Sequence, residues 1–359
     1  MSERKKKHAN ISLFIPHNGC PHRCAFCNQR TISGAVSQPS AKDVREAVST
    51  SLASPRFDGA NAEIAFFGGS FTAINREYMT ELLEAAHEYI ISGQVAGIRV
   101  STRPDAIDHE ILNILKKYGV TSIELGAQSM RDEVLLLNRR GHTAQDVIDA
   151  SHLIQQYGFS LGLQMMTGLY GDDNVGARYT ARQLAALRPD TVRIYPTVVL
   201  EGTELAEKMR TGDYRPQGYE DAAKLCAQLL RFFEQKRINV IKLGLHASDG
   251  VEGNMVGGAY HPAFRELCEG ILYYNLIKRE LSEKYPDGGD FVVYVPSEDI
   301  SKATGQKKCN ICHLAEEGWN IRIKGDDFID GNERRKCKIE PVHQPEAEGS
   351  QEGEVKTNG

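Results

Sequence analysis

The stretch that decides the fold is GCPHRCAFCN at residues 19–28, which holds three of the chain's eight cysteines. Cys20, Cys24 and Cys27 follow a C-x3-C-x2-C spacing. Three thiols this close bridge one another poorly, and a four-ligand zinc site normally adds a second, distant pair of ligands. Three clustered thiolates instead suit a 4Fe-4S cluster that keeps one iron open to a further ligand. Half of a zinc site and a chance cluster are the alternative interpretations.

The composition describes a chain of 359 residues, 41% of them hydrophobic, which is enough for one large domain and one small one. A net charge of −5 and a pI near 6.2 give no overall reason to expect nucleic acid, although a local basic face is compatible with them. Eight cysteines in this length do not form a disulfide framework, and clustered thiols need a reducing compartment. No apolar run approaches the length of a membrane span or of a signal-peptide core. We expect a soluble, cytoplasmic protein without a membrane partner.

Strands and helices are predicted to alternate along most of the chain. Short apolar runs indicate strands, and apolar residues at helical spacing indicate the helices between them, the first of which has Ser40 as its expected N-cap. This alternation predicts a parallel sheet with helices outside it, a partial TIM-type (βα)6 barrel whose function lies in the loops after the strands. The predicted strands are 12–16, 63–67, 97–101, 121–125, 159–165, 191–195 and 239–243, and the predicted helices are 41–53, 76–91, 106–118, 131–138, 144–157, 174–187 and 219–236.

A glycine-rich loop, Gly68-Gly69-Ser70, follows the second predicted strand. Two glycines let a backbone approach a charged ligand closely, although such a pair is by itself more often only a turn. In this position after the cysteine motif, the loop is similar to the glycine motif of the radical S-adenosylmethionine (SAM) superfamily, whose cysteine spacing the chain also has.

The resemblance to radical SAM enzymes implies two cofactors. Cys20, Cys24 and Cys27 would hold a 4Fe-4S cluster whose open iron binds the amino and carboxyl groups of SAM. An electron donor such as flavodoxin or ferredoxin would reduce the cluster. The reduced cluster would then cleave SAM and release a 5′-deoxyadenosyl radical. Phe26 would lie against the adenine, and Gly68, Gly69 and Ser70 would approach the methionine part of SAM.

Later segments resemble the radical SAM domain of the Elongator catalytic subunit, with oxygen-independent coproporphyrinogen oxidase as a more distant relative. This resemblance runs from about residue 11 to residue 275, and too few residues follow it for Elongator's acetyltransferase domain. It implies an enzyme that modifies RNA, with a tRNA base as the expected target. The matching motifs are STRPD at 101–105, ELGAQS at 124–129, NRRGHT at 138–143, RIYPT at 193–197, the segment 202–216 and GGAYHPAF at 257–264.

Further site residues are carried over from these relatives by position. Gln128 and Arg140 are implied SAM ligands, because an amide can bond ribose hydroxyls and a guanidinium can bind a carboxylate with two hydrogen bonds. Ser101 stands where the relatives usually have Glu, and Gln164 stands where the porphyrinogen oxidase is acidic. Other polar residues either face the substrate or form structural pairs; they are Arg103, Asp105, Tyr195, Lys242, Tyr260 and His261.

A small α/β domain is predicted at residues 276–340, after a barrel at 11–275. Its strand 291–296, helical turn 297–304, helix with Ile311 and Leu314 inward, and strand 319–324 resemble the core of a KH domain. In KH domains a G-x-x-G loop binds a nucleic-acid backbone. Here Lys308 takes the place of the second glycine and offers a phosphate contact instead. A plain α/β cap is the alternative.

The remaining cysteines and both ends of the chain receive simpler interpretations. Cys309, Cys312 and Cys337 are either ligands of a second metal or buried small residues, and the second interpretation is favoured. Cys226 and Cys268 are expected in helix cores. Residues 1–10 are predicted to be a mobile tail and residues 341–359 a disordered one.

The sequence therefore predicts a radical SAM enzyme that modifies RNA. Two alternatives stay open. One is a radical SAM enzyme that acts on a small molecule, as the porphyrinogen oxidase does. The other is an RNA-binding protein in which the cluster is only structural.

Overall fold

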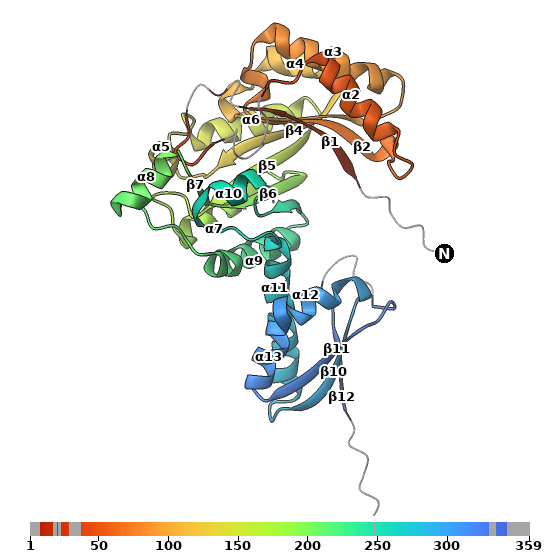
Figure 1. The fold of residues 1–359 in the computed structure, drawn as a ribbon, viewed down its shortest axis with the longest axis vertical. Coiled ribbons are helices and arrows are strands. Elements are labelled where there is room, and N and C mark those ends of the chain that lie inside the picture. Colours follow the sequence, from red (N-terminus) through yellow and green to blue (C-terminus); the bar gives the residue numbers. More distant parts are fainter. Residues whose placement is uncertain are drawn as a thin grey trace, which may run out of the picture. The chain divides into compact units, whose positions relative to one another are not determined.

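The computed structural model describes residues 8–16, 20, 23–28, 37–246, 249–329 and 335–342 (Figure 1). The chain divides into two compact units, one ending at Cys268 and the other starting at Glu269. The sequence placed this boundary a few residues later, between 275 and 276. Most of the two predicted tails lies outside the described residues, although strands begin at Ala9 and end at Pro341. No helix in the described ranges has the length and apolarity to cross a membrane.

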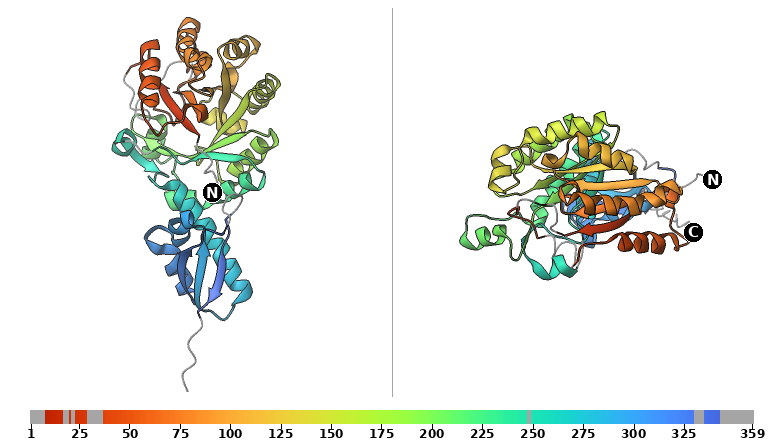
Figure 2. Two further views of the ribbon diagram at one scale, coloured as in Figure 1. Left: turned by 90° about the vertical axis from the view of Figure 1, so that its right-hand side faces the viewer. Right: turned by 90° about the horizontal axis from the view of Figure 1, so that it is seen from above.

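The first unit is built on a seven-stranded sheet in which every neighbouring pair of strands is parallel. The strands follow chain order across the sheet, apart from the skipped β7, and the sheet curls into a half-barrel (Figure 2). The predicted α/β half-barrel is thereby confirmed. Its strands are β1 (Ala9–Ile15), β2 (Ala62–Gly68), β3 (Gly97–Thr102), β4 (Val120–Gln128), β5 (Ser160–Thr167), β6 (Thr191–Pro196) and β8 (Asn239–Leu243).

Helices cover the outer face of this sheet (Figure 2). Ser40 caps α2 (Ala41–Leu52) through a reciprocal pair of hydrogen bonds with Asp43, as its sequence predicts. Val44 and Val48 of α2 are fully buried, which shows that the four-residue spacing marks the packed face. The other helices of this layer are α3 (Arg76–Ile91), α4 (His109–Lys117), α5 (Asp132–Leu137), α6 (Ala144–Gln156), α7 (Asn174–Ala186) and α9 (Tyr219–Gln235), with short 3-10 helices η1 (Gly59–Asn61), η2 (Phe71–Ala73) and η3 (Pro104–Ala106).

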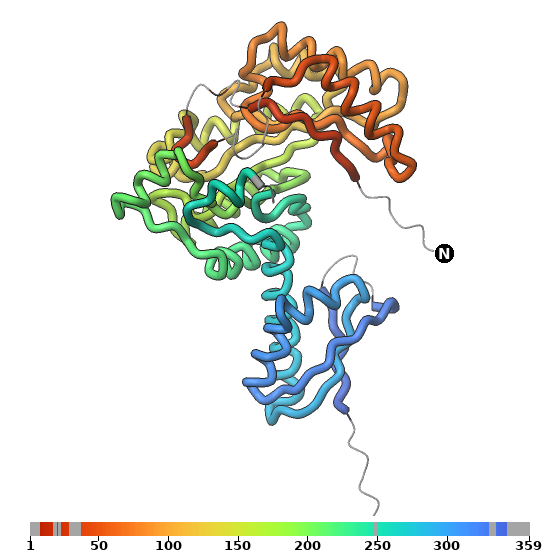
Figure 3. Tube along the Cα trace, viewed as in Figure 1, coloured from red at the N-terminus to blue at the C-terminus, as the bar shows by residue number. Residues whose placement is uncertain are grey.

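Two short strands outside the main sheet were not predicted. β7 (Val198–Leu200) pairs antiparallel with β9 (Met255–Gly258), so that chain segments far apart in the sequence lie side by side (Figure 3). Strands of three or four residues carry too little periodicity to be recognised, and their pairing is not local. The two helices next to them, α8 (Glu204–Thr211) and α10 (Asp249–Asn254), were also missed.

The second unit packs helices on one face of a three-stranded sheet ordered β11-β10-β12. Tyr273, Ile277 and Leu281 of α11 (Phe264–Lys284) recur every four residues, and they are fully buried in the same cluster as Phe291 and Trp319. The predicted strand–helix–helix–strand order is present, while membership of the KH fold remains a prediction. The other elements are β10 (Gly289–Val295), η4 (Ser297–Asp299), α12 (Ile300–Thr304), η5 (Gln306–Lys308), α13 (Cys309–Glu316), β11 (Trp319–Gly325) and β12 (Lys338–Pro341), the last of which was not predicted.

Candidate active site

A cavity of about 680 Å³ opens where the strands of the half-barrel end. Its volume is typical of pockets that bury a small organic ligand. Its walls come from the cysteine motif and from the ends of β2, β3, β4 and β5, which is where function lies in barrels of this type. The lining residues are Cys20, Arg23, Cys24, Phe26, Cys27, Asn28, Gly68, Gly69, Ser101, Thr102, Arg103, Gly126, Gln128, Arg140, Gln164 and Gly202.

The cysteine motif is held in place by backbone hydrogen bonds to distant segments. The amide of Ala25 donates to the carbonyl of Asn138 at 3.1 Å, and the amide of Leu205 donates to the carbonyl of Ala25 at 2.8 Å. All three cysteines of the motif line the cavity. The described residues contain no group of three metal-ligating side chains arranged to hold an ion. Joint ligation by the three cysteines therefore stays a prediction.

Two arginines set the electrostatics around the thiols. Burial raises the pKa of Cys20, Cys24 raises it further, and the positive charges of Arg103 and Arg140 oppose this rise. Nη1 of Arg140 lies 3.1 Å from Sγ of Cys24. These two guanidinium groups place positive charge beside the thiols, and the thiolate is the form that ligates iron.

Gln128 and Arg140, the two implied SAM ligands, meet at the carbonyl end of β4. Gln128 has a left-handed backbone with φ of 67°, and Arg140 donates from Nη2 to the carbonyl of Gly126 at 2.6 Å. A Cβ on Gly126 would lie 2.9 Å from Nε2 of Gln128, so a larger residue here would displace the Gln128 amide. A non-glycine residue in this backbone region carries strain that tends to mark functional sites.

Three buried polar atoms around the cavity have no hydrogen-bond partner in the described part of the chain. They are Oε1 of Gln128, Nε of Arg140 and Nη1 of Arg103. The rest of the Arg103 guanidinium is occupied, because Nε and Nη2 bind the Asp105 carboxylate at 2.9 and 3.0 Å. Buried polar atoms are almost always satisfied in folded proteins, so these three fit a ligand with several donors and acceptors. SAM, with its carboxylate, amine and ribose hydroxyls, is such a ligand.

The glycine loop contributes its backbone to the cavity wall. Gly68 has φ of 109°, and a Cβ there would lie 2.7 Å from the carbonyl oxygen of Ile15, so glycine is required on both counts. The amide of Gly69 donates to that same carbonyl at 2.7 Å. Ser70 is fully buried behind the wall, where its Oγ lies 2.8 Å from Oγ1 of Thr102 and accepts from the amide of Arg103. Ser70 thus holds the loop in place.

Ser101, Gln164 and Phe26 all line the cavity, each with further contacts. Nε2 of Gln164 donates to Oγ of Ser101 at 3.0 Å and to Oε2 of Glu124 at 2.8 Å. The serine in the position of the relatives' Glu is therefore part of a hydrogen-bonded chain. Phe26 packs against two apolar clusters, one centred on Leu205 and the other on Leu169.

A buried ion network below the cavity was missed at the sequence level. Glu124 is completely buried and accepts two hydrogen bonds from Arg193, at 2.6 and 2.8 Å, and one from Arg99 at 3.1 Å. Arg99 also binds Glu63 at 2.7 Å. Burial alone would raise the pKa of Glu63, but the hydrogen bond from Thr121 and the charge of Arg99 outweigh it and hold this pKa below its usual value. Charged residues inside otherwise apolar strands were the signal that could have revealed this network.

The remaining candidates separate into structural and unassigned residues. The hydroxyl of Tyr260 donates to Glu252 at 2.7 Å, and Nδ1 of His261 accepts from the amide of Ala263, so both make local structural contacts. Lys242 lies beside Arg193 in the sheet. Cys226 and Cys268 are fully buried, as predicted, whereas Cys312 is exposed and does not fit the expected helix core.

Comparisons with known proteins identify the family. The sequence matches the family model of the radical SAM superfamily over residues 14–184 and that of the radical SAM C-terminal domain over residues 189–273. An uncharacterized protein of Methanocaldococcus jannaschii is 31% identical over 224 residues, which cover 59% of this chain and 69% of that protein.

Two further relatives have names that state a function or a complex. The tRNA uridine(34) acetyltransferase of Methanocaldococcus jannaschii is 30% identical over 183 residues, which cover 45% of this chain and 34% of that protein. Elongator complex protein 3 of Homo sapiens is 31% identical over 192 residues, covering 47% and 34% respectively. The matched segment thus spans about a third of these two relatives.

Among solved structures, archaeal Elp3 of Methanocaldococcus infernus, lacking its N-terminus, superposes with a TM-score of 0.58 at 21% identity. The match covers 76% of this chain and 63% of that one. It confirms the fold. The family rests on the two family matches, which follow each other along the chain: this chain belongs to the radical SAM superfamily of enzymes.

Proposed function

We propose that this enzyme holds a 4Fe-4S cluster through Cys20, Cys24 and Cys27, cleaves SAM reductively and modifies RNA, with a tRNA base as the target. The observation that carries the proposal is the single cavity that gathers the three cysteines and the unpaired polar atoms of Arg103, Gln128 and Arg140. A cluster that was only structural would need no such polar surroundings.

The side chains of the cavity have separable tasks in this proposal. When bound, the cluster supplies one electron for SAM cleavage and SAM supplies the organic radical. Arg140 neutralises a carboxylate, and the amide of Gln128 bonds ribose hydroxyls. Gly68 and Gly69 let the backbone lie against the ligand without a side chain in between.

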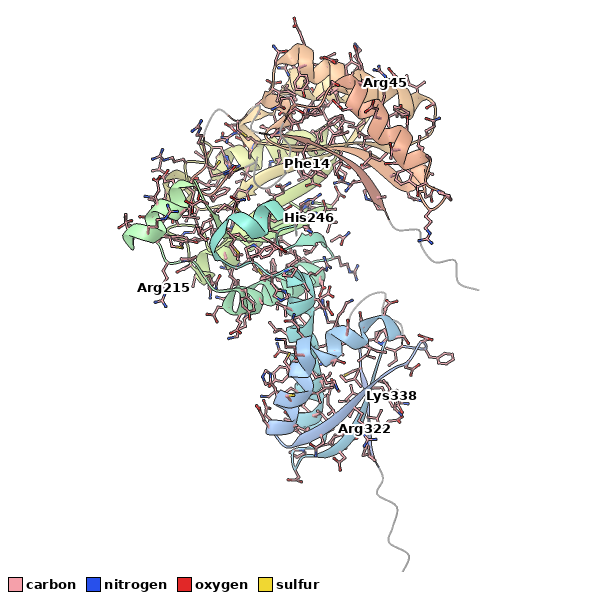
Figure 4. All side chains as sticks on the ribbon, viewed as in Figure 1. Phe14, Arg45, Arg215, His246, Arg322 and Lys338 are labelled. Atoms are coloured by element: carbon pink, nitrogen blue, oxygen red, sulfur yellow. The ribbon has the colours of Figure 1, made fainter. Side chains whose placement is uncertain are left out.

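Two features support RNA as the substrate. The relatives named as tRNA uridine(34) acetyltransferases share the barrel sequence, although only about a third of their length is matched. The second unit also presents basic groups. Lys307 and Lys308 stand in a left-handed turn between α12 and α13, and Arg322 projects from the face of the sheet opposite the helices, as does Lys338, which is paired with Glu340 (Figure 4). Cations in such positions can bind phosphates of a nucleic-acid backbone.

Anaerobic reconstitution tests the first half of this proposal. The protein should bind one 4Fe-4S cluster and, once reduced by dithionite, release 5′-deoxyadenosine from SAM. Cys24→Ala should lose both properties, whereas Cys312→Ala, at an exposed cysteine of the second unit, should keep both. A full iron content and normal cleavage in the Cys24 variant would show that the cluster ligands lie elsewhere.

Mass spectrometry of tRNA nucleosides tests the second half. A strain lacking this protein should lose or accumulate a specific modified nucleoside, and the wild-type gene should restore it. The Cys24→Ala gene should not. An unchanged nucleoside profile together with normal SAM cleavage would favour a small-molecule substrate. A bound cluster that never cleaves SAM would favour a structural role.

A further inference from the structure

Lys242 is a partly buried cation on the inner face of the half-barrel. It lies in β8, the last strand of the sheet, and is paired in register with Arg193 of β6. Side chains of directly paired residues in neighbouring strands point to the same face, so both cations face the interior. Among the residues that the structure describes, Lys242 has no acidic partner.

The charges around Lys242 do not balance. Arg99 and Arg193 match the two carboxylates of Glu63 and Glu124, which leaves the ammonium of Lys242 as an additional positive charge. Burial lowers the pKa of Lys242, and Arg193 and Arg265 lower it further. An anion placed beside Lys242 would remove this electrostatic cost.

An aromatic surface adjoins these cations. The guanidinium of Arg193 lies 5.0 Å from the centroid of the Phe67 ring, and the Phe67 ring lies 6.1 Å from that of Phe14. Phe14 is 38% exposed on the inner side of β1, whereas Arg45 lies in the outer helical layer (Figure 4). Ring contacts therefore connect the accessible Phe14 on one edge strand to Arg193, which is paired in register with Lys242 on the other edge strand.

The cation pair is also joined to the cavity of the cysteines. Gln164 lines that cavity and donates to Glu124, and Glu124 in turn holds Arg193. A substrate bound over Arg193 and Lys242 would thus lie next to the cavity and not on a remote surface. Nothing in the proposed handling of SAM uses Lys242, Arg193 or Phe14.

We infer that Lys242 is the cation of a subsite for a phosphate group of the substrate, next to the Glu124-bound Arg193, and that Phe14 offers a ring on which the attached base stacks. A nucleotide combines an anion with an aromatic ring, which is the pair of groups that this wall presents. The subsite deepens the proposed function, since an RNA would supply the phosphate from its backbone. A free nucleoside monophosphate carries the same chemistry.

Lysine-selective NMR tests the subsite directly. The full-length protein is reductively methylated with ¹³C-formaldehyde, and the Lys242 signal is identified by its loss in Lys242→Arg. Titration with uridine monophosphate and with inorganic phosphate should shift this signal saturably, while that of exposed Lys236 stays in place. A Lys242 signal that moves no more than the other lysine signals would overturn the inference.

Binding measurements with several ligands test whether the subsite exists and whether its phosphate comes from RNA or from a free nucleotide. Lys242→Ala should weaken binding of uridine monophosphate and of tRNA about tenfold, and flatten the salt dependence of tRNA binding by a slope of about 0.7. Phe14→Ala should weaken the nucleotide but not inorganic phosphate. Lys242→Arg should retain binding, and the control Lys236→Ala should match wild type.

Thermal unfolding of each variant shows that it is folded before its affinity is interpreted. Nucleotide binding that depends on Lys242, without any binding of tRNA, would support the subsite and contradict RNA as the substrate. Equal affinities of Lys242→Ala and wild type for both ligands would overturn the subsite, whatever the fate of the proposed function.

Discussion

The guanidinium of Arg193 in β6 lies 5.0 Å from the ring centroid of Phe67 in β2, although three strands separate these two in the sheet. Neighbouring strands are about 4.8 Å apart, so a flat sheet would hold the two strands roughly 19 Å from each other. The short distance between Arg193 and Phe67 therefore shows that the sheet curls strongly. Long charged side chains then meet across its interior, and this explains why an ion network occupies a place where a second apolar layer would otherwise pack.

The ion network should contribute strongly to stability. Glu124→Ala removes the carboxylate shared by Arg99 and Arg193 and leaves buried positive charge uncompensated, which should lower the free energy of unfolding by about 3–5 kcal/mol. Urea unfolding measures this loss. Glu46→Ala, at an exposed carboxylate of α2, is the matched control.

A double variant distinguishes charge imbalance from simple loss of packing. Glu124→Leu combined with Arg193→Met removes one charge of each sign and should cost less than Glu124→Ala alone. If the single variant unfolds within about 1 kcal/mol of wild type, water or another group must already compensate the arginines.

SAM affinity should depend on Gln128 and Arg140. Replacing either by Ala removes one polar contact with the cofactor, and for Arg140 a charge-assisted one, worth about 1.5–3 kcal/mol or roughly ten- to a hundredfold in affinity. Equilibrium dialysis under anaerobic conditions measures the affinity, and iron analysis checks that the cluster is retained. Arg178→Ala, which removes a surface guanidinium bound to Gln228, should bind SAM normally. Wild-type affinity in both site variants would place SAM elsewhere.

His142 should make the fold sensitive to mild acid. Burial, with a smaller effect of Arg140, lowers its pKa from 6.5 to about 4. The folded protein then binds fewer protons than the unfolded chain between these two values, so its free energy of unfolding falls as pH is lowered through this window, by about 3 kcal/mol in total. Nε2 donates to the carbonyl of Ala127, a bond that Gln can retain. His142→Gln should therefore lose this part of the acid sensitivity.

Urea midpoints at neutral pH and at the lower end of the window give the comparison for His142. Exposed His246→Gln should follow the wild-type curve. Parallel curves for wild type and His142→Gln across the window would show that His142 has the same pKa in the folded and unfolded protein, so that burial does not lower it.

The turn between α12 and α13 should bind RNA through its two lysines. Lys307→Glu with Lys308→Glu removes two phosphate contacts, so tRNA affinity should fall and its salt dependence should flatten by a slope of about 1.4 for single-stranded contacts. Fluorescence anisotropy at several salt concentrations measures both. Lys42→Glu with Lys236→Glu makes the same charge change on the barrel and should have little effect. Equal slopes for the turn variant and wild type would remove the KH-like interpretation.

The spacing of apolar residues predicted the half-barrel well, because each of its strands and helices is longer than one repeat of the apolar pattern that marks a strand or a helix. Val44 and Val48, for example, mark the buried face of α2 at the sequence level and are fully buried in the structure. The same method failed for β7 and β9, since their pairing depends on residues far apart in the chain.

The sequence predicted those site residues that belong to a local motif and missed those that meet only in the folded structure. Cys20, Cys24, Gln128 and Arg140 belong to recognisable motifs, and the structure brings them to one cavity. Ser70 shared a motif with Gly68 and Gly69, yet its hydroxyl is turned toward Thr102. The partners of Glu124 come from three different strands, which no local pattern specifies. What a sequence alone cannot supply is which side chains meet across a curled sheet.

The two backbone hydrogen bonds of Ala25 have a consequence for the order of events during synthesis. The motif leaves the ribosome early, but its anchors at Asn138 and Leu205 follow only after most of the barrel has emerged. Until then the motif lacks both of these backbone hydrogen bonds. If Cys20, Cys24 and Cys27 hold the proposed cluster, a cluster inserted after the α8 segment has emerged would meet a loop already held by both hydrogen bonds of Ala25.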